Sequence, residues 1–171
     1  MRLLFQDEAR FGRIHDPRRC WAPYPMRPTV SSQMIREYTY AYGAVCPFDG
    51  VADFLILPFM TAVVMNRFLE EVAKRHCGEY ILMIYDGAPC HELGALTIPK
   101  NMMIEKLPPY SAELNPVEHV WEEVREKFFK NYVFNSMDAV EEKLIEALCY
   151  LENNPELVKS ITGFKWIVNH S

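Results

Sequence analysis

Residues 79–86, EYILMIYD, decide the fold class. Apolar side chains follow one another here without polar alternation, until the run ends at Asp86. Such a run is typical of a central strand that is covered on both faces, as in a sheet with helices on each side. The sequence therefore predicts an α/β protein with Asp86 at the carboxyl end of a buried strand.

The stretches on the amino-terminal side predict three more strands. Residues 3–5 form a short apolar run that ends at Asp7, and we expect Asp7 to stand at the end of that strand. From Glu8 to about Thr29, four prolines predict an irregular excursion, a loose hairpin around Trp21. Residues 36–58 then read as two antiparallel strands joined by a turn at residues 47–50, PFDG.

Helical spacing dominates the remaining stretches. Residues 61–77 predict an amphipathic helix capped by Thr61, and a short helix is expected over residues 91–96. Residues 102–106 suggest an edge strand, and residues 138–151 a late helix that Pro155 interrupts. The expected order, β-β-β-α-β-α-β-α-α, is that of a mixed sheet with helices on its faces.

The stretch NPVEHVW, residues 115–121, opens one more helix and leaves two roles open for Glu118. Asn115 is a favourable N-cap, Pro116 suits the first helical position, and Glu118 falls three residues after the cap, as in a capping box. Glu118 also lies on the flank of a buried apolar stripe that comprises Val117, Val120, Trp121, Val124 and Phe128. It can therefore serve as a cap or as a metal ligand.

Length and composition favour one domain over residues 1–171, since 50% of the 171 residues are hydrophobic. No apolar run reaches the roughly 20 residues that span a bilayer, so we expect a soluble, cytoplasmic protein without a membrane partner. Five cysteines, an odd number without a C-x-x-C pair, indicate reduced thiols.

The charge is unevenly distributed. Seven arginines against three acids give residues 1–36 a net charge of +4, which leaves −9 for the other 135 residues because the whole chain carries −5. An arginine-rich loop beside an acidic site would suit a phosphate backbone, although a merely solvated loop is the alternative. The candidate DNA contacts are Arg10, Arg13, Arg18, Arg19 and Arg27.

Three carboxylates from distant parts of the sequence can meet at one sheet edge. Asp7 and Asp86 are expected at strand ends, and Glu118 begins a helix that can pack there. Carboxylate oxygens without thiolates suit Mg²⁺ or Mn²⁺, and two such ions would assist a phosphoryl displacement. Glu8, His91 and Asn115 are secondary candidates, although a histidine here is more often packed or hydrogen-bonded than a ligand.

Three motifs, in this order and spacing, resemble the catalytic domain of DDE transposases: FQDEARFG, ILMIYDGAPCH and LPPYSAELNPVEHVW. The closest resemblance is to the bacterial insertion-sequence family six-thirty within the mariner superfamily, over about residues 1–130. It implies an RNase H-like fold and a catalytic, metal-binding triad of Asp7, Asp86 and Glu118. Gly87 and Ala112 stand where the family often has asparagine and proline.

The resemblance also implies a reaction and its partners. Mg²⁺, or Mn²⁺ in its place, would support cleavage of DNA at transposon ends and strand transfer into target DNA, with two ions when DNA is bound. Members carry N-terminal helix-turn-helix domains, whereas Asp7 lies close to the start here. We therefore expect a homodimer or assembly with a separate DNA-binding polypeptide, at the nucleoid of a prokaryotic cell.

Two alternatives belong to other classes. A catalytically inactive transposase fragment would act as a DNA-binding, assembly or inhibitory module. A receiver domain would use Asp7, Glu8 and Asp86 as its acid pair and phosphoacceptor, but the long excursion and the NPVEHVW helix have no role in it.

Overall fold

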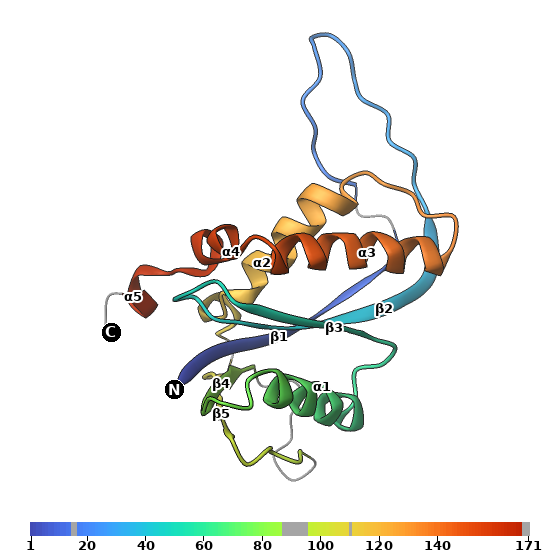
Figure 1. Ribbon diagram of the computed structural model, residues 1–171. Helices are drawn as coiled ribbons and strands as arrows, with labels where there is room; N and C mark the ends of the chain where they lie inside the picture. Colours follow the sequence, from blue (N-terminus) through green and yellow to red (C-terminus); the bar gives the residue numbers. More distant parts are fainter. Residues whose placement is uncertain (15–16, 87–95, 110, 169–171) are drawn as a thin grey trace.

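The structure is a computed structural model that describes residues 1–14, 17–86, 96–109 and 111–168. Within these residues the strands form one mixed sheet with the order β3-β2-β1-β4-β5 (Figure 1). The bounds are β1 Arg2–Ile14, β2 Met34–Val45, β3 Ala52–Leu57, β4 Ile81–Tyr85 and β5 Met102–Lys106. β1 is central: it pairs antiparallel with β2 and parallel with β4. β5 is a parallel edge strand beside β4.

Helices cover both faces of this sheet (Figure 1). On one face lies α1, Ala62–Arg75, whose Thr61 cap accepts the N–H of Val64. The other face carries α2 and α3, followed in the chain by α4. The bounds are η3 Ala112–Leu114, α2 Val117–Val124, the π-helical turn η4 Arg125–Phe129, α3 Met137–Glu152, α4 Pro155–Thr162 and α5 Lys165–Val168. Among the described residues, no helix is both long and apolar enough to cross a bilayer.

Strand alternation divides the buried side chains into two cores. Leu4, Tyr42 and Met83 face α1, where they meet Phe68 and Leu69. The opposite core contains Phe5, Ala9 and Phe11 of β1 with Val120 and Trp121 of α2, and α3 extends it. β1 contributes Leu4 to the first core and Phe5, Ala9 and Phe11 to the second, so its register also fixes the face on which Asp7 lies.

Most of the predicted elements are confirmed. The two antiparallel strands, the buried strand ending before Asp86, the edge strand over residues 102–106 and the helix after Thr61 all form. The turn between β2 and β3 contains Gly50 at φ 74°, a left-handed conformation that favours glycine. The helix expected over residues 91–96 falls almost wholly outside the described residues.

Two predicted boundaries are wrong. Asp7 does not end a strand, because β1 runs on to Ile14 and stays paired with β2 as far as Met34. Glu8 and Arg10 suggested the start of a loop, yet they alternate with the buried Ala9 and Phe11. The irregular excursion therefore begins after Ile14, and it extends away from the helical layers (Figure 1). The helix α2 begins at Val117, one position later than predicted, although the Asn115 side chain accepts the N–H of Val117 as a capping residue does.

Candidate active site

Asp7 and Asp86 lie side by side because of the parallel register of β1 and β4. The strands pair from Arg2 with Ile81 to Phe5 with Ile84, and the same offset continued by two residues places Asp7 level with Asp86. Neighbouring strands are about 4.8 Å apart. Alternation from Phe5 and Ile84, which both contact the α2 core, directs both aspartates to the face that α2 covers.

Asp7 is buried under α2, with 6% of its surface exposed. Its Oδ2 accepts a hydrogen bond of 2.9 Å from the indole Nε1 of Trp121. Gly43, the partner of Asp7 across β2, permits this approach, because a Cβ there would lie 2.8 Å from the Trp121 ring. The carboxylate is thus held in one orientation by a ring that is itself 1% exposed.

Glu118 does not close a capping box. The N–H of Asn115, which such a box would use, donates instead to the carbonyl of Ala112 at 2.9 Å. Glu118 is the second residue of α2 and is exposed. Its carboxylate is consequently available for another role.

Asn115 fixes the start of α2 to the strand that carries Asp7. Its side chain, in a residue only 2% exposed, donates from Nδ2 to the carbonyl of Gln6 at 2.8 Å and accepts at Oδ1 from the N–H of Val117 at 3.2 Å. Since Gln6 precedes Asp7 and Val117 precedes Glu118, this one amide links the two acidic positions. Asn115 therefore acts as a positioning residue.

The electrostatics show that the acids neighbour one another. Burial first, then the charges of Glu118, Glu8 and Asp86, raise the pKa of Asp7 to about 8. Asp7 is thus largely protonated at neutral pH unless a positive charge joins it. A divalent cation would remove this cost, because it attracts each of the repelling carboxylates.

The donor set fits a hard divalent cation, since it offers carboxylate oxygens and no thiolate. Asp7, Asp86 and Glu118 are the residues that would hold the ion. Within the described parts of the chain, however, no three potential ligands lie close enough together to bind one ion. The charges of Glu118 and Asp86 nonetheless raise the pKa of Asp7, and carboxylate side chains adjust their rotamers readily.

Neither Glu8 nor His91, two of the secondary candidates, can be placed with the triad. Glu8 lies on the opposite face of β1 from Asp7 by alternation, and its Oε1 accepts from Gln6 Nε2 at 2.9 Å. The charge of Glu8 nevertheless raises the pKa of Asp7. His91 lies outside the described residues.

The candidate arginines fall into two groups. Arg13 pairs with Glu37 at 2.7 Å, and Arg18 pairs with Glu122 at 3.0 Å and with Glu126. Arg10, Arg19 and Arg27 are exposed, and Arg10 lies over the ring of Tyr38 at 4.8 Å. Contact of these side chains with DNA stays a prediction.

Sequence reasoning missed the role of Trp121. Its place on the buried stripe of the helix indicated a core aromatic, which is correct. The sequence does contain one indication of this role. Trp121 lies three residues after Glu118, about one turn along the same helix, so its indole lies near any site to which Glu118 contributes. Nothing in the sequence pairs it with Asp7, 114 residues away.

Residues 2–141 match the family described as DDE superfamily endonuclease. The chain belongs to the DDE superfamily of endonucleases. An uncharacterized protein of Sinorhizobium fredii, y4pE/y4sA, is 33% identical to this DDE chain over 130 residues, which cover 75% of this chain and 96% of that protein.

Solved structures of Mos1 transposase show the same fold. The Mos1 mariner paired-end complex with Mn has a TM-score of 0.63 and 15% identity, over 99% of this chain and 56% of that chain. The Mos1 paired-end complex with the left transposon end has a TM-score of 0.61 and 16% identity, over 95% of this chain and 55% of that chain. The DDE chain therefore spans about half the length of the Mos1 chains, and its fold is RNase H-like, as predicted.

Replacing Asp7 by asparagine is expected to change how stability depends on pH in a chelating buffer. Because the folded-state pKa is raised, the folded protein keeps a proton that the unfolded chain loses, so stability falls as pH rises from about 4 to about 8. The slope from this group is at most about 1.4 kcal/mol per pH unit. Denaturant unfolding of Asp7→Asn should lack this slope, whereas the exposed Asp138→Asn should keep it; an unchanged slope in Asp7→Asn would contradict the assignment.

Trp121→Phe keeps one aromatic ring but removes the pyrrole ring with the N–H that donates to Asp7, and the lost packing costs stability at every pH. The expected loss of stability is about 1–3 kcal/mol where Asp7 is ionised, near pH 9, and less near pH 5, because a buried carboxylate without a donor is costly. Trp166→Phe, which alters a half-exposed ring against Phe5, should show no such difference between the two pH values. Equal losses for Trp121→Phe at both pH values would mean that only packing is affected.

Proposed function

We propose that this chain is the catalytic domain of a DDE transposase, which cleaves DNA at transposon ends and transfers the strand to target DNA. The observation that carries the proposal is the register of β1 and β4, which sets Asp7 level with Asp86 while the charge of Glu118 acts on Asp7. Membership of the DDE endonucleases supports it, as does the likeness to the paired-end complex of Mos1 transposase with its left transposon end.

Divalent cations are the cofactors that this proposal requires. Mos1 complexes have been solved with Mn and with Mg, and the acidic donor set here suits either ion. When bound, such ions supply Lewis-acid assistance to the attacking and leaving oxygens of a phosphodiester. We propose Mg²⁺ as the usual ion, Mn²⁺ as its substitute, and two ions when DNA is present.

Other residues of the chain position the carboxylates. Trp121 fixes the orientation of Asp7 by donating to Oδ2, and Asn115 ties the first turn of α2 to the strand at Gln6. Glu118, exposed at that first turn, is accessible to a DNA strand that lies across the ends of the central strands. Burial of Asp7 keeps water from one side of the site.

DNA is the proposed partner and substrate. A second copy of the chain, or a separate polypeptide that recognises the transposon ends, completes the proposed assembly. The proposed location is the cytoplasm, at the nucleoid when DNA is bound.

Nicking of supercoiled plasmid in Mn²⁺ tests the proposal without knowledge of the end sequence. We expect Asp86→Asn to lower the nicking rate at least about a hundredfold, because removing one carboxylate removes several kcal/mol of assistance. Glu105→Gln, which alters an exposed carboxylate on the adjacent β5, should nick like the wild type.

Two results would count against the proposal. Nicking by Asp86→Asn at the wild-type rate would show that the assigned carboxylates do not carry the reaction. A folded wild-type chain that neither binds Mn²⁺ nor nicks DNA would favour the inactive fragment, which acts by binding or assembly alone.

A further inference from the structure

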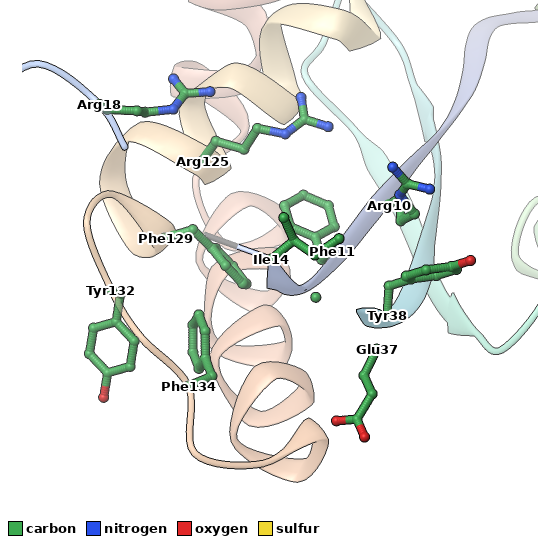
Figure 2. A pocket seen from close by; sticks show the side chains of 11 residues that line it. Arg10, Phe11, Ile14, Arg18, Glu37, Tyr38, Arg125, Phe129, Tyr132 and Phe134 are labelled. Carbon is green, nitrogen blue, oxygen red and sulfur yellow. The ribbon is translucent and has the colours of Figure 1, made fainter. Parts of the chain in front are cut away.

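A cavity of about 290 Å³ lies at the far end of β1, beyond the acidic site (Figure 2). It is formed where the end of β1 meets β2 and the π-helical turn η4. Its lining combines guanidinium groups with aromatic rings: Arg10, Arg18, Tyr38, Arg125, Phe129 and Phe134. The volume is at the lower end of small-ligand sites, which are roughly 300–1,000 Å³. It therefore suits a group the size of one nucleotide.

Arg10 and Arg125 both lie over aromatic rings, and Arg125 also forms an ion pair with Glu122. Arg10 lies over Tyr38, with 4.8 Å between its Cζ and the ring centroid, and no carboxylate in the described parts of the chain pairs with it. Arg125 lies over Phe11 at 5.4 Å, and the carboxylate that approaches it, on Glu122, is 3.5 Å away. Stacking on a ring face orients a guanidinium while its N–H edges stay available to an anion.

The acids near the cavity are largely neutralised. Glu37, which lines it, pairs with Arg13 at 2.7 Å, and Glu122 and Glu126 both bind Arg18. The cavity is therefore positive within a chain whose net charge is −5. Figure 2 shows Arg10 with Tyr38 on one side and Arg125 on the other, with Phe11 between them.

The cavity is built from the same two elements as the acidic site. Arg10 lies three residues after Asp7 on β1, about 10 Å along the strand, and by alternation its side chain leaves the face opposite to that of Asp7. Arg125 lies seven residues after Glu118, about 10 Å along a helix. Successive nucleotides of one strand rise about 3.4 Å in a duplex, so this separation is about three nucleotides.

An aromatic series joins the two places. Phe11 contacts Phe129 of η4 at 5.0 Å between ring centroids and Trp121 at 6.2 Å, and Trp121 donates to Asp7. The floor of the cavity is thus continuous with the support of the catalytic carboxylate. A π-helical turn at this point is also a feature that is frequent at functional sites.

We propose that this cavity binds one nucleotide of the DNA strand that crosses the carboxylates, about three nucleotides from the bond to be cut. Arg10 and Arg125 receive its phosphate, and Phe129 and Phe134 form an apolar floor for its sugar or base. This inference rests on the proposed function for the identity of the ligand, but the site itself is separate from Asp7, Asp86 and Glu118.

Salt-dependent binding of fluorescein-labelled DNA, measured by fluorescence anisotropy in EDTA, tests the inference. Arg10→Gln and Arg125→Gln should each weaken binding about tenfold, as expected when a charge-assisted phosphate contact is lost. Each should also reduce the slope of log K against log salt by about 0.9 for a duplex or 0.7 for a single strand. Arg67→Gln removes the same charge from the exposed side of α1, on the other face of the sheet, and should leave both quantities close to the wild type.

The outcomes separate this inference from the proposed function. Wild-type Mn²⁺ affinity in Arg10→Gln, with weakened DNA binding, supports a distinct nucleotide site. Equal DNA binding by Arg10→Gln and Arg67→Gln overturns the inference and leaves the carboxylate site intact. A wild-type chain that binds Mn²⁺ but no DNA does the same. Because Arg125 is half-buried, the thermal unfolding of Arg125→Gln is measured as well. Tyr38→Leu, which removes the ring beneath Arg10, is expected to weaken DNA binding as Arg10→Gln does.

Discussion

The carboxylate of Asp7 is buried between the sheet and α2, beside other acids, and the arrangement of the site follows from the free-energy cost of that position. Burial and the charges of Glu118, Glu8 and Asp86 raise its pKa to about 8, so ionisation at neutral pH is unfavourable without a cation. The indole of Trp121 supplies one donor, and the remaining compensation must be positive charge. A site that is unstable when ionised and empty is well suited to bind a divalent cation.

The same constraint explains the packing around the strand. Gly43 leaves room for Trp121 to reach Asp7, and Asn115 holds the start of α2 against the backbone at Gln6. These contacts fix two elements, β1 and α2, relative to each other. Both elements continue to the cavity between Arg10 and Arg125, so a strand of DNA bound there would be aligned with the carboxylates by rigid secondary structure.

Much of this could be predicted from the sequence, for identifiable reasons. The continuous apolar run ending at Asp86 marked a central strand, and helical spacing marked α1, α2 and α3. The extension of β1 to Ile14 was missed, because the charged residues Glu8 and Arg10 hid a buried alternation that only pairing with β2 reveals. The hydrogen bond from Trp121 to Asp7 joins residues 114 positions apart, and local periodicity carries no information on such a contact. The ion pairs of Arg13 and Arg18 were likewise invisible, since their partners depend on where the excursion returns to α2 and β2.

Calorimetric titration of Mn²⁺ at pH 7, in two buffers of different ionisation enthalpy and with a short DNA duplex present, tests the central claim most directly. If Asp7 is protonated in the free protein and ligates the ion, binding should release about one proton per site, since a ligand carboxylate must be deprotonated. Asp7→Asn should bind more weakly and release none. Proton release that is the same in both proteins, or the absence of Mn²⁺ binding by a folded wild-type chain, would contradict the assignment of the buried carboxylate to a metal site.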